Sequence, residues 1–263
     1  MRLLVCIPVV NQWEFGRISL GQWDWMTTTD ADFLLLDNGS TCNWQEWLEK
    51  ACLRGRGRWA YVRNEQNIGL LRSSQQAYEY AAAYGYDLLA IAHNDVWVWE
   101  KDWDYHANSL FRSEAYNVGA LGFFGSKGCN RDGLRINTFG NVLDWGHGRR
   151  MDRQWEPACI LEGFFQCYRV RMLQEAGGFD QRYKHMHIYD YDASLTSLSL
   201  GYRNVVLNVP CHHLSGLTAN NDAKAISGPD TMRYNMTQFH EKWDSRLGAM
   251  VEDDFSIKWG LGR

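Results

Sequence analysis

The regular alternation of short apolar segments with helical segments over the first hundred residues constrains the fold of this chain more than any other feature. Apolar residues cluster at 3–10, 33–36, 59–62 and 88–92, as expected of buried strands. Between them, residues 43–52 and 70–84 place their apolar side chains at helical spacing. Strands that alternate with helices form parallel sheets with right-handed crossovers, so this region predicts an α/β fold.

The segment 88–99, LLAIAHNDVWVW, is the centre of this pattern. Residues 88–92 are uniformly apolar, which is typical of a central parallel strand, and His93, Asn94 and Asp95 follow where that strand should end. Open α/β sheets bind ligands beyond the carboxyl ends of their strands, so Asp95 is a candidate to meet a metal-bound phosphate. Alternatively, Asp95 caps a turn or the next helix, and these three residues alone do not decide between the two roles.

Three segments rich in aromatic residues or glycine are expected in loops near the surface. Residues 12–29 predict an irregular loop with a short helix, and residues 125–135, GSKGCNRDGLR, predict a mobile surface loop because no helical pattern follows the glycines. Residues 146–150 form a basic turn that either is simply solvated or borders an acceptor site.

Composition limits the classes of protein to which the chain can belong. With 263 residues and 45% hydrophobic content, it can bury the core of one large domain, and its net charge of −4 gives no electrostatic case for a polyanion partner. The seven cysteines form no CxxC motif, so neither a disulfide framework nor a zinc site is expected. No apolar stretch reaches 18 residues. We therefore expect a soluble cytoplasmic protein in a reducing compartment, without a transmembrane segment; its oligomeric state stays open.

Several motifs occur in an order that resembles the nucleotide-binding half of family two glycosyltransferases. They are VCIPVVN, LLLDNGST, RNEQNIGLLRSSQQA and IAHNDVWV, joined later by EGFFQCYRVRMLQEAGGFDQRY and YDYDASLTSLSLGYRNVVLNVPCHHLSGLT. The resemblance implies a GT-A fold, an α/β architecture with a Rossmann-like, mostly parallel central sheet flanked by helices, in a single domain with an acceptor-side subregion. It further implies that residues 1–100 form the nucleotide-sugar-binding half and residues 101–263 the acceptor-binding and catalytic half.

The resemblance also assigns the nucleotide-sugar donor to named residues. The aspartate that matches Asp37 recognises the base, commonly uracil, and the stretch that matches residues 67–72 lies along the nucleotide. The implied donor-binding residues are Pro8, Val10, Asp37, Asn67, Gly69, Arg72, Asn94 and Asp95. His93 stands where the family often has a first aspartate, so the usual contact of that aspartate with the ribose is not expected here.

A divalent cation, Mn²⁺ or Mg²⁺, is the cofactor that the resemblance implies. Asp95 matches the aspartate that holds the cation on the diphosphate, and one carboxylate is enough because such ions keep several waters and bind phosphate oxygens. Two adjacent histidines, His212 and His213, follow the last predicted strand, and at most one is expected to reach the metal. The pattern His213, Gly216 and Thr218 resembles the metal-binding histidine of the family, which selects His213; a core histidine is the alternative.

A second acidic cluster lies at a predicted helix start. Asp190 and Asp192 precede Leu195 and Leu198 at helical spacing, and Asp192 is expected to cap this helix. In the family the acid that matches Asp190 is the general base that takes a proton from the acceptor hydroxyl. Gly163 lies inside an apolar strand-like segment, which favours the close approach of a ligand.

Together these features predict a metal-dependent inverting glycosyltransferase that moves a sugar from a nucleotide-sugar, most simply a UDP-sugar, to a hydroxyl acceptor. A glycan, a lipid carrier, a protein and a hydroxylated base of modified viral DNA all remain open as acceptors. The alternative is a catalytically inactive sugar- or nucleotide-binding protein on the same fold. Such a protein would not need Asp37, Asp95, Asp190 and His213 together. A nucleotidyltransferase would carry a glycine-rich phosphate loop after the first strand, where this chain has PVVNQW.

Overall fold

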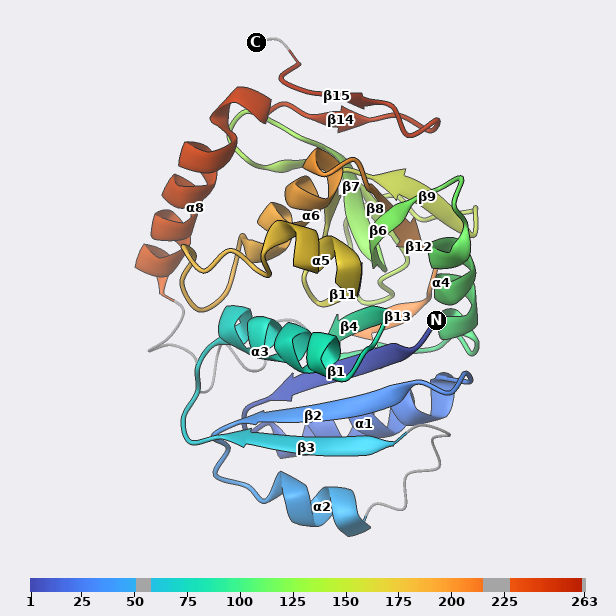
Figure 1. Ribbon diagram of the computed structural model, residues 1–263, viewed down its shortest axis with the longest axis vertical. Helices are drawn as coiled ribbons and strands as arrows, with labels where there is room; N and C mark the ends of the chain where they lie inside the picture. Colours follow the sequence, from blue (N-terminus) through green and yellow to red (C-terminus); the bar gives the residue numbers. More distant parts are fainter. Residues whose placement is uncertain (51–57, 215–227, 262–263) are drawn as a thin grey trace.

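A central eight-stranded sheet organises the molecule in a computed structural model that describes residues 1–50, 58–214 and 228–261 (Figure 1). The strand order is β3-β2-β1-β4-β11-β6-β12-β9. In that order the strands span Trp59–Asn64, Asp32–Asn38, Leu3–Val9, Leu88–Ala92, Phe165–Arg169, Val118–Gly122, Arg203–Leu207 and Trp155–Ala158. The four strands predicted from the apolar segments of the first hundred residues are therefore all present and adjacent.

The first four strands run parallel, and the direction changes at β11. Parallel pairing joins β1 to β2 and β4, and β2 to β3. In contrast, β11 pairs antiparallel with both β4 and β6. Because β11 runs against β4, the residues that precede β11 lie at the same edge of the sheet as the residues that follow β4.

Helices cover both faces of this sheet. Their bounds are α1 Trp13–Met26, α2 Trp44–Lys50, α3 Leu70–Ala83, α4 Trp103–Arg112, α5 Val170–Ala176, α6 Tyr189–Ser199 and α8 Pro229–Trp243, followed by the 3₁₀ turn Asp244–Arg246. Alternate residues of β1 enter two separate apolar layers: Leu4 and Cys6 pack with α3, α5 and α6, whereas Val5 and Ile7 pack with α1 and α4. This period of two places the sheet between two buried cores, as the apolar strands predicted.

Residues 12–29 are more regular than expected. Instead of a loop with a short helix, Trp13–Met26 form one helix of 14 residues, in which Leu20 and Trp23 are fully buried. The ring of Trp23 stacks on Phe165 of the central sheet with 5.3 Å between ring centroids. Contact of these aromatic side chains with the sheet stabilises a helix that its own periodicity predicts only weakly.

The prediction of a mobile surface loop at residues 125–135 is wrong. Residues 125–129 lie in β7, Phe124–Cys129, and residues 130–134 connect it to β8 (Arg135–Gly140), with which it pairs. Both strands belong to a smaller sheet with β10 (Ile160–Leu161), β14 (Met250–Val251) and β15 (Ile257–Lys258). A Cβ atom on Gly125 would lie 2.5 Å from the carbonyl oxygen of Ile160, so this glycine permits close packing of strands. Gly125 therefore marks a place where two strands pack closely and not a loop.

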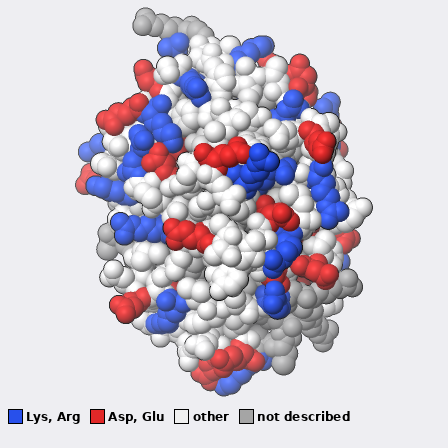
Figure 2. All heavy atoms as spheres, viewed as in Figure 1, with Lys and Arg blue, Asp and Glu red and all other residues white. Residues whose placement is uncertain are grey.

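A third, two-stranded sheet joins distant parts of the chain. β5, Val96–Val98, pairs antiparallel with β13, Cys211–His213, and His213 lies opposite Val96. This pairing brings His213 next to the residues that follow β4. No helix in the described ranges is long and apolar enough to cross a bilayer. On the face drawn in Figure 2, basic and acidic side chains are interspersed, in keeping with the small net charge.

Candidate active site

A cavity of about 300 Å³ opens at the edge of the central sheet where β1 and β4 end and β11 begins. The backbone N–H of His93 donates to the carbonyl of Phe164 over 2.9 Å, which ties the two strand ends together. The lining comprises Pro8, Val9, Val10, Asn38, Asn67, Gly69, Leu70, His93, Asn94, Asp95, Glu162, Gly163, Phe164, His185, Met186, His187, Tyr189, Asp190 and His213. Ligand pockets of α/β sheets occur at this edge, and this one has the size of a small ligand site.

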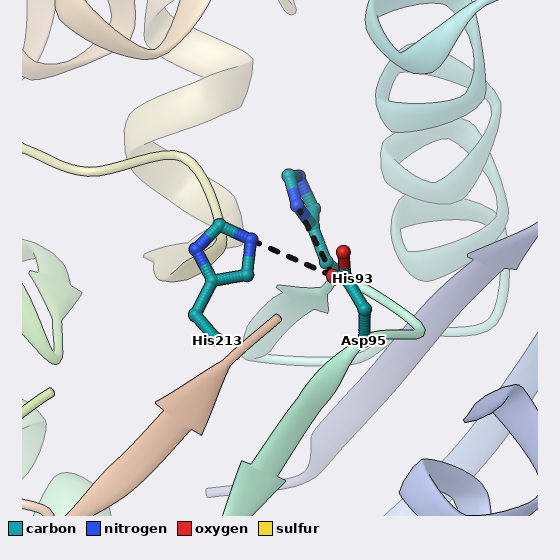
Figure 3. A group of neighbouring side chains, drawn as sticks. All are labelled: His93, Asp95 and His213. Atoms are coloured by element: carbon teal, nitrogen blue, oxygen red, sulfur yellow. Dashed lines mark ion pairs between the residues drawn. The ribbon is translucent and has the colours of Figure 1, made fainter. Parts of the chain in front are cut away.

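His93, Asp95 and His213 form a compact group of potential metal ligands in this cavity. Nε2 of His213 lies 3.5 Å from Oδ1 of Asp95, and Nδ1 of His93 lies 3.9 Å from the same oxygen. One ligand atom from each residue lies within 4.8 Å of the others. Figure 3 shows the three side chains directed toward one another from two separate segments. Within the described residues, two imidazoles and one carboxylate are therefore placed to share one cation.

The charge state of His93 suits metal binding. Burial lowers the pKa of His93 to about 4, the Asp95 carboxylate opposes this shift, and the neighbouring His213 and His187 rings add to it. The imidazole of His93 is therefore neutral near pH 7 and keeps a lone pair for a cation. Its Nε2 atom is buried without a hydrogen-bond partner among the described residues. A buried polar atom of this kind favours a ligand at the site.

The pleat of β13 sends its two histidines to opposite sides. Residues that alternate along a strand point to opposite faces, so His213 faces Asp95 while His212 faces away. Nδ1 of His212 accepts a hydrogen bond from Nε1 of Trp99 over 2.6 Å. The backbone N–H of His213 donates to Oδ1 of Asp144. The structure thus brings His213 to the candidate metal group and keeps His212 out of the cavity. Gly216 and Thr218, the other members of this pattern, lie outside the described residues.

Asp190 lies in the first turn of α6 and lines the same cavity. Its side chain is buried, and Oδ1 has no hydrogen-bond partner in the described part of the chain. Burial raises the pKa of Asp190 to about 6, and the positive charge of Arg135 opposes this shift. A carboxyl group with a pKa near neutrality can take up a proton during a reaction at physiological pH.

Gly163 makes room for Asp190 itself. A Cβ atom at position 163 would lie 2.8 Å from Oδ2 of Asp190 and 3.2 Å from its Cγ, so any side chain here would displace the carboxylate. The close approach that an isolated glycine predicts is therefore made by the buried acid. The requirement for glycine at this position follows from the placement of Asp190.

Asp192 faces the other side of α6 and does not cap the helix, so that prediction is wrong. No side chain caps the N-terminus of α6, and Asp192 lies inside the first turn. Its carboxylate accepts hydrogen bonds from the Tyr183 hydroxyl, the Lys242 ammonium and Nε1 of Trp243, each about 2.8–2.9 Å long. Asp192 therefore connects α6 to α8. Asp180, which binds the same Lys242, accepts from the backbone N–H of Arg182 and so organises a turn.

Two of the implied donor-binding residues do not line the cavity. Asp37 is fully buried at the end of β2, and its carboxylate accepts from Ser40 N–H at 2.8 Å, Tyr61 hydroxyl at 2.7 Å and Arg63 guanidinium at 2.6 Å. Arg72 is exposed on α3. Pro8, Val10, Asn67, Gly69 and Asn94 do line it, together with Asp95.

Several cavity residues were missed by the sequence reasoning, among them Glu162, His185, Met186 and His187. Glu162 forms an ion pair with Arg135, and His185, Met186 and His187 lie in the connection between α5 and α6. The only signal for that connection was the pair of histidines shortly before Asp190, in a stretch without hydrophobic periodicity. Histidines that close to an acidic cluster were a reason to suspect a site, but no spacing rule placed them in the cavity.

The chain is similar to solved structures of glycosyltransferases with the GT-A fold, three of which follow. GalNAc-T7 in complex with UDP, GalNAc and Mn²⁺ matches with a TM-score of 0.70 and 14% identity over 92% of this chain and 48% of that protein. A Pyrobaculum calidifontis mannosyltransferase with GDP-Man and Mn²⁺ matches with a TM-score of 0.58 and 16% identity over 90% and 68%. Residues 1–349 of S. aureus TarS with UDP-GlcNAc match with a TM-score of 0.57 and 16% identity over 79% and 56%.

These similarities establish the fold. The chain adopts the GT-A fold, a mixed α/β architecture with a large central sheet flanked by helices, which confirms the fold expected from the sequence motifs. It spans only about half the length of two of these proteins. No protein-family model and no curated protein sequence matches the chain.

Proposed function

We propose that this protein is a metal-dependent glycosyltransferase that moves a sugar from a nucleotide-sugar to a hydroxyl acceptor with inversion at the anomeric carbon. One observation carries the proposal. A cluster of two histidines and an aspartate shares a single cavity with a buried acid of raised pKa, at the ligand-binding edge of a GT-A sheet. Solved structures with this fold hold nucleotides, nucleotide-sugars and Mn²⁺.

The donor is expected to bind along the first half of the chain, residues 1–100. Pro8, Val10, Asn67, Gly69 and Asn94 supply the cavity surface that would meet the nucleotide. Asp37, which the family resemblance assigns to the base, is fully buried and bound by Tyr61 and Arg63, so its carboxylate could meet a base only if those two side chains moved. UDP-sugars are the first donors to test, because solved structures with this fold hold UDP or UDP-GlcNAc. The second half, residues 101–263, would contribute the general base and the acceptor side.

The cation would be held by Asp95, His213 and His93. This donor set fits a divalent metal that leaves positions open for water and for diphosphate oxygens, and two imidazole nitrogens favour Mn²⁺ over Mg²⁺, which prefers oxygen ligands. When bound, such a cation neutralises the charge that develops on the departing diphosphate. His93 would thus supply a neutral imidazole ligand at the position where the family often has an aspartate that contacts the ribose.

Asp190 would act as the general base. The acceptor hydroxyl attacks the anomeric carbon, its proton passes to the Asp190 carboxylate, the new glycosidic C–O bond forms, and the bond to the diphosphate breaks. The raised pKa of Asp190 supports this role because proton transfer is most effective when the pKa lies near the working pH. Attack from the side opposite to the leaving group inverts the anomeric configuration.

Calorimetry tests the donor and metal site without knowledge of the acceptor. UDP binding should depend on Mn²⁺ in the parent protein, and Asp95→Ala or His213→Ala should weaken it roughly 10- to 100-fold. His212→Ala is the matched control, because it removes the adjacent imidazole from the opposite face of β13. Equal binding of UDP and Mn²⁺ by Asp95→Ala and the parent would refute the metal site.

Turnover separates an enzyme from a binding protein on the same fold. Incubation with UDP-sugars and Mn²⁺ should release UDP slowly even without an acceptor, because water can replace the acceptor hydroxyl. Nuclear magnetic resonance of the released sugar then gives its anomeric configuration. Tight UDP binding without release of UDP from any donor would instead support a catalytically inactive nucleotide-binding protein, and a product with retained configuration would contradict the inverting mechanism.

A further inference from the structure

One wall of the cavity is built from a backbone segment in an unusual conformation. In the connection between α5 and α6, His185, His187 and Ile188 have φ angles of 53°, 70° and 69°. This left-handed region is rare for residues with a side chain, and especially for a β-branched residue such as isoleucine. His185, Met186 and His187 line the cavity, and Asp190 follows two residues after Ile188.

A single buried side chain of α8 holds this segment. Oδ1 of Asn235 accepts from the Lys184 N–H at 2.8 Å, and its Nδ2 lies 2.9, 2.8 and 3.1 Å from the carbonyl oxygens of Lys184, Met186 and His187. The amide group has two hydrogens for these three acceptors, so one hydrogen is shared. Asn235 has no exposed surface. Its amide therefore satisfies the N–H of Lys184 and the carbonyls of Lys184, Met186 and His187 in a segment that forms no regular structure.

The start of α3 supports the segment from the opposite side. The N–H of Leu71 donates to the carbonyl of His185 over 2.8 Å. Gly69, with φ of +82°, lies so close that a Cβ atom would come within 2.8 Å of the His185 Cα. The strained segment is thus held between α8 and the stretch that begins α3, where the donor nucleotide is expected. Strained backbone persists where its surroundings determine it, and such residues concentrate at functional sites.

We propose that Asn235 is a positioning residue of this active site. It clamps residues 184–188 so that their side chains form the cavity wall and α6 begins where Asp190 faces Gly163. In Figure 1, α8 lies along one edge of the molecule next to α6, at the side from which this clamp acts. The inference rests on the proposed function for its catalytic consequence, but the clamp itself does not depend on that function.

Asn235→Ala tests the clamp, with Met236→Ala as the matched control. Met236 is the next residue of α8 and packs toward Gly133, away from residues 184–188. Hydrogen exchange of the backbone amides of residues 185–189 should accelerate in Asn235→Ala and not in Met236→Ala. If Asn235→Ala does not fold, Asn235→Asp keeps the acceptor for Lys184 N–H and removes the donors to the carbonyls, and it is expected to show the same acceleration.

The kinetic consequence is a selective loss of kcat. UDP release from a UDP-sugar with Mn²⁺ should slow roughly 10²-fold in Asn235→Ala, since a displacement of about 1 Å in a catalytic group has an effect of this size. Binding of UDP with Mn²⁺ should stay within about threefold of the parent, because the candidate metal ligands lie on other segments. Met236→Ala should keep parental kcat.

The outcomes separate this inference from the proposed function. Unchanged exchange at residues 185–189 in Asn235→Ala overturns the clamp, whatever the activity. Equal kcat in Asn235→Ala and the parent overturns the positioning role, even if exchange is faster. A parent protein that releases no UDP from any donor refutes the proposed function, whereas faster exchange only in the Asn235 variants would still support the clamp.

Discussion

Two carboxylates in the first turn of α6 lie in opposite environments: Asp190 faces the cavity, and Asp192 faces α8. Asp190 faces the cavity with an oxygen that has no partner in the described part of the chain, and burial raises its pKa to about 6. Asp192 faces α8 and accepts hydrogen bonds from Tyr183, Lys242 and Trp243. The contrast teaches that a buried carboxylate with an unpartnered oxygen is available for chemistry, whereas a buried carboxylate surrounded by donors contributes to stability.

The largest expected effect is on turnover and is confined to the cavity side. Asp190→Asn keeps the shape of the side chain and removes its basicity, so UDP release should fall by roughly 10²- to 10⁴-fold while UDP and Mn²⁺ still bind. Steady-state kinetics and calorimetry on the same preparation measure both quantities. Near-parental turnover of Asp190→Asn would show that Asp190 is not the general base.

The next effect is on stability and belongs to the α8 side. Asp192→Asn removes the negative charge that pairs with Lys242 and accepts hydrogen bonds from Tyr183 and Trp243. The free energy of unfolding should therefore fall by about 3 kcal/mol. Urea unfolding followed by tryptophan fluorescence measures this change. Asp180→Asn is the control, since it removes a partner of the same Lys242 at a more exposed site. A loss in Asp192→Asn no larger than in Asp180→Asn would argue against Asp192 as the connection between α6 and α8.

The pH dependence of kcat gives a second test of Asp190 as the general base. Its raised pKa means that the base becomes protonated as pH falls through about 6, so kcat should decline below that pH by about tenfold per unit. UDP and Mn²⁺ binding measured over the same range separates loss of the base from loss of the donor. A flat kcat profile between pH 5 and pH 7, at saturating donor and metal, would be inconsistent with Asp190 as the group that titrates.

The smallest effect is a gain in stability on the cavity side. Because the pKa of Asp190 is raised in the folded state, its contribution to stability is greatest below its unfolded value of 3.8 and is lost as pH rises through about 6. Asp190→Asn avoids this loss and should be more stable than the parent at pH 7, by on the order of 1–2 kcal/mol. Thermal unfolding should show the difference at pH 7 and not at pH 4; a less stable variant at pH 7 would contradict the raised pKa.

Local pattern was enough to predict much of the donor half. The apolar run 88–92 with His93, Asn94 and Asp95 after it predicted a central strand and a polar cluster at its end, and both are present. The alternation of strands and helices predicted a parallel sheet in this region, because a buried parallel sheet needs continuous apolar segments and crossover helices. Those requirements apply to stretches of a few residues, so they can be recognised in the sequence.

Long-range pairing decided the rest. The antiparallel pairing of β13 with β5 determines that His213 faces Asp95 and His212 does not, and the reversed direction of β11 sets Gly163 against Asp190. Asn235 reaches residues 184–188 only because α8 packs beside α6. By itself the sequence determined where the strands of the first half lie and which residues are candidates for the chemistry. Which of those residues meet was decided by the tertiary structure, because strand direction, pleat and helix packing depend on contacts between segments that are far apart in the chain.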